Sequence, residues 1–116
     1  MLNKKIEEAL NAQINAELWS AYLYLSMAAY AHANGNPGMG NWFEVQFHEE
    51  QDHAKIMFNY IIQRGGRVEL KPIDAVPTTW ESPLAVSAHT NAPLSSNNLV
   101  KSGSSISLPT STILAL

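Results

Sequence analysis

Apolar residues recur at helical spacing over the first third of the chain. Residues 3–33 contain neither glycine nor proline, and their apolar or small residues lie three or four positions apart. This spacing gathers side chains on one face of an α-helix. The members of this stripe are Leu10, Ile14, Ala21, Leu25 and Ala28, with Leu18 and Tyr22 beside them. The pattern predicts a helix over residues 3–33, ended by Asn34-Gly35 as a left-handed cap.

A second helical stripe begins after a short connection. Asn36-Pro37 is a helix start signal, because asparagine caps the first amides and proline suits the first helical position. The stripe that follows consists of Phe43, Phe47, Ala54, Met57 and Ile61. It predicts a helix over residues 37–64, which Gly65-Gly66 ends. Because the connection is so short, we expect the two helices to pack antiparallel.

The sequence changes character after the second helix. Residues 67–82 alternate apolar residues with prolines, which predicts an extended crossover. Ser82-Pro83 is again a helix start signal, but no amphipathic pattern follows it. Residues 87–116 hold one charged side chain and eight Ser, three Thr, three Asn and two Pro. Such a composition disfavours helices, so we divide the chain into residues 1–86 and an irregular or disordered tail.

Three polar residues interrupt the apolar stripes. Glu17 lies within the first stripe and Glu50 within the second, and His53 follows Glu50 by one helical turn. A carboxylate in a bundle interior costs several kcal/mol unless it is paired, protonated or bound to a metal. Tyr24 also lies in the first stripe, where a core aromatic is the ordinary interpretation. Glu49 and Asp52 are interpreted as solvated.

The three polar residues are expected at the same level of the hairpin. With residue 35 as its centre, Glu17 lies 18 residues before it, His53 18 residues after it and Glu50 15 residues after it. At about 1.5 Å per residue, they fall within one helical turn of each other. Two carboxylates and an imidazole suit iron, manganese or zinc, and Glu-x-x-His occurs in di-metal carboxylate bundles. The plainer alternative is a core histidine hydrogen-bonded to a neighbour.

Composition excludes several other functions. Seven Lys and Arg against ten Asp and Glu give a net charge of −3 and no basic patch, so we expect no nucleic-acid partner. The absence of cysteine excludes disulfides, iron–sulfur clusters and thiol catalysis. The N-terminus has no apolar segment typical of a signal peptide, and no apolar run reaches the roughly 18 residues of a membrane span. We therefore expect a cytoplasmic protein without a membrane partner.

Residues 1–86 resemble the N-terminal half of a bacterial non-haem ferritin. The resemblance is carried by Leu10-Asn11-Ala12-Gln13-Ile14-Asn15-Ala16-Glu17, Ser20-Ala21-Tyr22-Leu23-Tyr24-Leu25-Ser26-Met27, Phe47-His48-Glu49-Glu50-Gln51-Asp52-His53-Ala54 and Ile61-Ile62-Gln63-Arg64-Gly65-Gly66-Arg67-Val68, and it ends near Trp80-Glu81-Ser82-Pro83-Leu84. It implies an all-α fold, here the first two helices of a four-helix bundle, and a homo-oligomeric cage that stores iron as ferric mineral. It also implies a di-iron centre without haem, where dioxygen oxidises Fe(II).

The resemblance assigns a role to individual residues. Glu17 would ligate one iron, Glu50 would bridge the two irons, and His53 would ligate the first. Tyr24 would lie beside the centre, hydrogen-bonded to a ligand, as a possible redox participant. Glu49 matches a position that some bacterial ferritins use for an adjacent third iron.

The resemblance fails after residue 86. The family takes a Glu from its third helix and a Glu or Gln from its fourth, but this chain has no Asp, Glu or Gln after Glu81. A shifted reading frame, a truncated or wrongly assembled gene, and a genuinely divergent tail all remain open. With half of the ligands, we expect weak metal binding and poor ferroxidase activity.

Other functions compete with the ferritin interpretation. The main alternative is a non-catalytic helical hairpin that associates with intact ferritin subunits. Among related enzymes, a rubrerythrin would need cysteines. A haem-containing bacterioferritin would use a methionine such as Met57, but the surrounding sequence matches the non-haem family better. The DNA-protecting mini-ferritins use a different ligand pattern.

Overall fold

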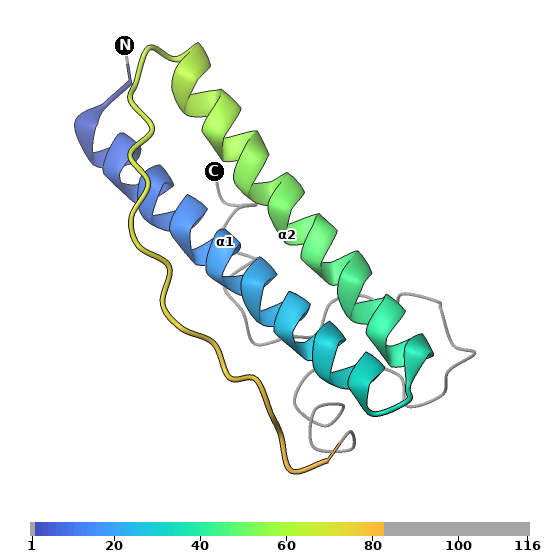
Figure 1. Cartoon of the computed structure of the whole chain (residues 1–116). Helices are drawn as coiled ribbons and strands as arrows, with labels where there is room; N and C mark the ends of the chain where they lie inside the picture. The colour runs from blue at the N-terminus through green and yellow to red at the C-terminus, as the bar shows by residue number, and fades with distance from the viewer. Residues whose placement is uncertain (1, 83–116) are drawn as a thin grey trace.

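Two long helices form an antiparallel hairpin, and an extended segment returns along the first of them (Figure 1). This computed structural model describes residues 2–82. Helix α1 spans Lys4–Ala33 and helix α2 spans Pro37–Gln63, and the described residues contain no strand. The predicted all-α hairpin is thus confirmed. The expected irregular tail, 87–116, lies outside the described residues.

Side-chain caps and one glycine define the hairpin turn and the helix starts. Asn3 has an extended backbone, and its side chain accepts a hydrogen bond from the Lys5 amide at 2.7 Å. Asn36 does the same for the Met39 amide at 3.3 Å, as its place before Pro37 predicted. Gly35 has a φ of +73°, the left-handed conformation that glycine adopts without strain.

The hairpin interior consists of two apolar clusters. The cluster near the turn contains Leu23, Tyr24, Met27, Ala28, Ala31, Met39, Trp42 and Phe43. The cluster near the open end contains Leu10, Ile14, Ala54, Met57 and Ile61. Leu25, which was assigned to the first stripe, is instead 40 % exposed, and Tyr22, which was placed beside the stripe, is 53 % exposed. Each directly follows a buried residue, and a step of one residue turns a side chain about 100° away from the core.

The crossover, residues 66–82, packs along α1 in the same chain direction (Figure 1). Val68 packs against the open-end cluster, and Val76 and Trp80 pack against the cluster near the turn. Leu70 and Ile73 remain exposed at 62 % and 43 %. The extended form of this segment agrees with the alternation of apolar residues and prolines. No helix within the described residues is long and apolar enough to cross a membrane.

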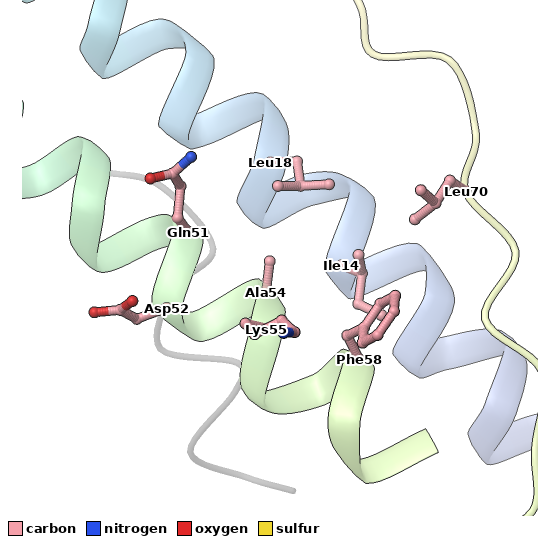
Figure 2. A pocket seen from close by; sticks show the side chains of 8 residues that line it. All are labelled: Ile14, Leu18, Gln51, Asp52, Ala54, Lys55, Phe58 and Leu70. Carbon is pink, nitrogen blue, oxygen red and sulfur yellow. The ribbon is translucent and has the colours of Figure 1, made fainter. Parts of the chain in front are cut away.

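An apolar groove of about 400 Å³ runs between the two helices and the crossover (Figure 2). Ile14 and Ala54 are its buried members, and Leu70 borders it from the crossover. Asp52 and Lys55 belong to its lining on α2. The groove lies where the two helices and the crossover pack together, and none of its lining residues belongs to the polar cluster described below.

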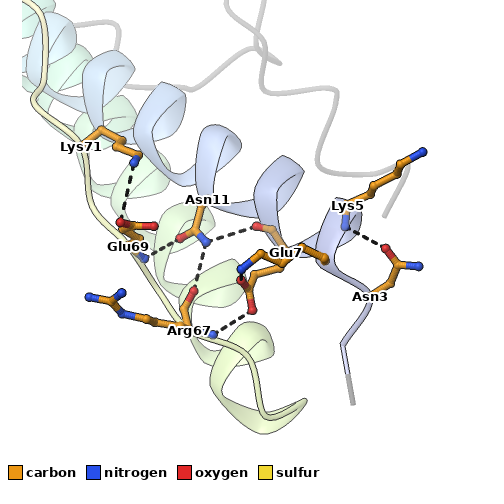
Figure 3. Close-up of polar contacts among 8 residues, drawn as sticks. Asn3, Lys5, Glu7, Asn11, Arg67, Glu69 and Lys71 are labelled. Carbon is orange, nitrogen blue, oxygen red and sulfur yellow. Dashed lines mark hydrogen bonds and ion pairs between the residues drawn. The ribbon is translucent and has the colours of Figure 1, made fainter.

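Side chains of α1 hold the start of the crossover by its backbone (Figure 3). The Asn11 amide donates to the Arg67 carbonyl at 3.0 Å, and its oxygen accepts from the Glu69 amide at 2.8 Å. One asparagine thereby pairs with the extended backbone as a neighbouring strand would. Glu7 Oε1 accepts from the Arg67 amide at 3.0 Å, and this hydrogen bond lowers the pKa of Glu7.

The far end of the crossover is held in the same way. The Ser26 hydroxyl donates to the Pro77 carbonyl at 2.6 Å, and the Tyr30 hydroxyl donates to the Trp80 carbonyl at 2.8 Å. The Tyr30 and Trp80 rings also meet edge to face, with centroids 5.3 Å apart. Side chains of α1 therefore hold the crossover near both of its ends.

Candidate metal centre

Glu17, Glu50 and His53 converge between the two apolar clusters. One ligand atom from each residue lies within 4.8 Å of the others. His53 Nδ1 is 3.0 Å from Glu50 Oε1 and 3.4 Å from Glu17 Oε1. The antiparallel hairpin thus brings Glu17 of α1 to the level of the Glu-x-x-His pair of α2, as residue counting from the turn predicted.

Both carboxylates are buried, whereas the histidine is reached by solvent. Glu17 is 0 % exposed and Glu50 is 3 % exposed, while the His53 side chain keeps 35 % of its surface. Glu50 and His53 point the same way because they are three residues apart on one helix. Buried carboxylates without a full counter-charge are costly, which is the usual mark of a site rather than of a core.

Each carboxylate has one oxygen that makes a hydrogen bond and one oxygen that makes none among the described residues. Gln13 Nε2 donates to Glu17 Oε2 at 2.7 Å, and Glu50 Oε1 pairs with His53. Glu17 Oε1 and Glu50 Oε2 have no hydrogen-bond partner among the described residues. Two carboxylate oxygens and an imidazole nitrogen at this separation fit a divalent metal that accepts oxygen and nitrogen, such as iron, manganese or zinc.

The electrostatics of the pair also favour a cation. Burial, followed by the negative charge of Glu17, raises the pKa of Glu50 to about 8. Two adjacent buried carboxylates cannot both ionise at low cost, so the metal-free pair retains a proton at neutral pH. A metal ion between them would replace that proton.

Tyr24 lies beside the cluster within the apolar core. It is 2 % exposed, and its ring centroid is 6.2 Å from that of Phe43. Burial, and then the charges of Glu50 and Glu17, raise its pKa well above the ordinary value. The described residues contain no hydrogen bond between its hydroxyl and either carboxylate, so the expected bond to a ligand stays a prediction.

Glu49 is not among the three residues whose ligand atoms converge. It is half-buried on α2, next to Glu50 in sequence. Adjacent residues on a helix point about 100° apart, which explains why Glu49 does not join Glu50. Its role at an adjacent iron stays a prediction.

Several polar residues near the cluster were not predicted from the sequence. Gln13 precedes Glu17 by four residues, the spacing at which helical side chains meet, and this spacing could have identified it. Ser20 and Gln46 are 0 % and 3 % exposed, and Ser20 Oγ and Gln46 Nε2 have no hydrogen-bond partner among the described residues. The Trp42 indole nitrogen is also buried and unpartnered.

Comparison with known proteins assigns the chain to one family. A sequence profile described as the ferritin-like domain matches residues 7–92. A bacterial non-heme ferritin of Bacteroides fragilis is 46 % identical over 89 residues, which are 77 % of this chain and 56 % of that protein. The chain therefore belongs to the ferritin-like family, as the resemblance of residues 1–86 predicted.

Further relatives agree on which part of the family fold is present. A bacterial non-heme ferritin of Staphylococcus haemolyticus is 40 % identical over 82 residues, which are 71 % of this chain and 49 % of that protein. The open-pore ferritin of the archaeon Archaeoglobus fulgidus superposes with a TM-score of 0.73 at 50 % identity, covering 77 % of this chain and 55 % of that one. The chain thus spans about half the length of the relatives that it matches.

Proposed function

We propose that this chain is an iron-storage subunit of the ferritin type, in which Glu17, Glu50 and His53 bind iron for oxidation by dioxygen. The observation that carries the proposal is the convergence of these three ligands within 4.8 Å inside a ferritin-like hairpin. Hard carboxylate oxygens bind Fe(III) more strongly than Fe(II), so the site favours oxidation. Iron is the substrate here, and its ferric product is the stored material.

The remaining roles of the proposal follow the family resemblance. Glu50 would bridge two irons, Tyr24 would lie beside them, and Glu49 would serve an adjacent iron. A homo-oligomeric cage without haem, located in the cytoplasm, would hold the mineral. The buried Glu17 and Glu50 supply the binding charge, and the half-exposed His53 leaves a route for iron to enter.

Anaerobic titration of the full 116-residue chain with Fe(II), followed by oxygen, tests this proposal. We expect saturable iron binding and a rise of near-ultraviolet absorbance when oxygen is added. Glu50→Ala should abolish both, whereas Asp52→Ala, which removes an exposed carboxylate two residues away, should leave both unchanged. Iron binding that Glu50→Ala does not alter would contradict the proposal.

One observation favours a second candidate function. The sequence holds no acidic residue after Glu81, so this chain alone supplies only part of the ligand set that the family implies. A non-catalytic hairpin that associates with intact ferritin subunits would need no complete centre. Co-assembly with a complete ferritin, in the absence of saturable iron binding by the isolated chain, would identify this alternative.

A further inference from the structure

Gln13 contacts the metal cluster through one oxygen of Glu17. Its side-chain amide donates to Glu17 Oε2 at 2.7 Å, and the two residues are four apart on α1, the spacing at which helical side chains meet. The other oxygen, Glu17 Oε1, is 3.4 Å from His53 Nδ1. The two oxygens of Glu17 therefore have different neighbours. Oε2 faces Gln13, and Oε1 faces the cluster.

The hydrogen bond from Gln13 fixes how the Glu17 carboxylate is turned. The last torsion of a glutamate side chain is broad, so the torsion by itself does not set the plane of the carboxylate. Glu17 is 0 % exposed, so bulk water does not compete for its oxygens. A donor at 2.7 Å from an ionised oxygen is a strong hydrogen bond and sets this plane.

The donor is an uncharged amide, which suits the neighbour of a metal ligand. Glutamine donates through its NH₂ group without carrying a positive charge. It therefore contacts Oε2 and leaves the negative charge of Glu17 uncompensated. A lysine or arginine at the same place would neutralise this charge and reduce the attraction of the buried carboxylate for a cation. Gln13 thus orients Glu17 without weakening its attraction for a metal ion.

We propose that Gln13 is a positioning residue that orients Glu17 so that Oε1 is the atom offered to the metal. The ligand atoms of Glu17, Glu50 and His53 lie within 4.8 Å of one another, and this arrangement depends on the orientation of each carboxylate. Hydrogen bonds from an outer shell orient metal ligands, and losing one typically costs about 10–100-fold in metal affinity. In this role Gln13 acts through Glu17. The inference rests on the proposed metal-binding function.

The neighbouring amide side chains of α1 have other surroundings. Asn11 pairs with the backbone of the crossover. Asn15 borders a polar hollow beside Glu69 and Lys71. Residues two apart on a helix point about 200° apart, so Asn15 and Gln13 face nearly opposite ways. Asn15 is half-buried, as Gln13 is, and therefore offers a matched control on the same turn of α1.

Titration of the full 116-residue chain with Co(II), followed by visible absorption, tests the inference. Co(II) is an air-stable probe for oxygen and nitrogen ligands, and its absorption reports the geometry of the ligands around it. Gln13→Met keeps a long unbranched side chain but removes the donor, so the Glu17 carboxylate loses its fixed orientation. We expect the Co(II) spectrum to change and the dissociation constant to rise about 10–100-fold.

A second substitution and a control separate the hydrogen bond from packing. Gln13→Ala removes the bulk of the side chain as well as the donor. Because both variants lack the donor, they should change the spectrum and the dissociation constant alike. Asn15→Leu removes an amide of similar volume two residues from Glu17 and should leave both quantities unchanged. Circular dichroism shows whether each variant keeps its helices.

The outcomes distinguish failure of this inference from failure of the proposed function. If Gln13→Met keeps the spectrum and affinity of the unmodified chain, the positioning role is overturned and the metal-binding function stands. An effect of Gln13→Ala alone would assign Gln13 to packing, and equal effects of Asn15→Leu would show a general response of α1, so either overturns the inference. Co(II) binding by the unmodified chain that is not saturable, or that Glu50→Ala leaves unchanged, overturns the proposed function and the inference together.

Discussion

Glu17 and Glu50 are carboxylates at positions where a helix normally carries apolar core side chains. Their positions are those of apolar residues in a stripe, and their burial is complete or nearly so. Gln13 and His53 each form a hydrogen bond with one oxygen of the pair, and the remaining oxygens are buried without a hydrogen-bond partner among the described residues. The free energy lost by burying these groups indicates a binding site, because buried apolar side chains would stabilise the hairpin more.

The stability of the metal-free chain should fall as pH rises. The pKa of Glu50 is about 8 in the folded chain and 4.5 in ordinary surroundings, so folding favours its protonated form. The stabilisation is complete below about pH 4.5 and is lost as pH rises to about 8, with a slope of at most about 1.4 kcal/mol per pH unit. Urea unfolding with a chelator present, followed by circular dichroism across this range, measures it.

Glu50→Gln is the control for this pH dependence. The amide has nearly the same shape but does not titrate, so the variant should lose the Glu50 contribution to the slope. Glu7, the other carboxyl with a shifted pKa, does not interfere, since its pKa is lowered and it titrates below this window. Equal slopes for the two proteins would refute the assignment.

At the scale of the elements, the hairpin depends on its helix caps, on one turn glycine and on the attachment of the crossover to α1. Asn3 and Asn36 cap the helix starts, and Gly35 allows the reversal between them. The crossover has no hydrogen-bonded ladder of its own, so side chains of α1 satisfy its backbone at both ends. These contacts fix the direction in which the chain leaves the hairpin.

Gly35→Ala should destabilise the chain by about 1 kcal/mol. The cost comes from the positive φ of 73°, because no atom lies within 4 Å of the place of a new side chain. Gly35→Asn should cost less, since asparagine tolerates the left-handed conformation better than alanine does. Thermal unfolding of the two variants should therefore rank them in this order. A smaller loss for alanine than for asparagine would show that the backbone conformation is not the cause.

Asn11→Ala should release the start of the crossover. It removes the two hydrogen bonds to the crossover and a third to the Glu7 carbonyl, and should cost about 1–3 kcal/mol. Hydrogen exchange at the Glu69 amide should accelerate more than exchange within α2. Asn15→Ala, one turn further along α1, is the matched control and should change neither quantity. Similar effects of both substitutions would point to a general loss of helix stability instead.

At the scale of the whole molecule, the described residues form one antiparallel helical hairpin with an extended crossover along α1. Two apolar clusters hold the hairpin together, and the metal ligands lie between them. The crossover runs along α1 and is held at both of its ends by side chains of that helix. The chain spans about half the length of the relatives that it matches.

Among the residues that line the apolar groove, only the buried ones should contribute much to stability. Ile14 is 2 % exposed between the helices, so Ile14→Ala should cost about 2–5 kcal/mol through lost burial and a cavity. Leu70 lines the same groove from the crossover but is 62 % exposed, so Leu70→Ala should change stability by no more than about 0.5 kcal/mol. Urea unfolding compares them. A large loss for Leu70→Ala would show that the crossover seals the groove.

The sequence by itself determined the local structure and the candidate ligands. Helical spacing, the Asn36-Pro37 start and the glycine-containing turn depend on neighbours along the chain, so the ranges of both helices could be predicted closely. The level of Glu17 against Glu50 and His53 also followed from counting residues along two antiparallel helices. The exposure of Leu25 was predicted wrongly, because the edge of a buried arc depends on what packs beside it.

Only the tertiary structure decided which atoms meet. The hydrogen bond between the Asn11 side chain and the Glu69 amide joins residues 58 positions apart, and nothing in the local sequence pattern indicates which backbone groups Asn11 contacts. Likewise, the sequence shows that Ser20, Trp42 and Gln46 exist, but not that their polar atoms are buried without partners. Whether a side chain is buried and hydrogen-bonded depends on segments that are distant in sequence but close in space. They therefore emerge only when the helices and the crossover are brought together.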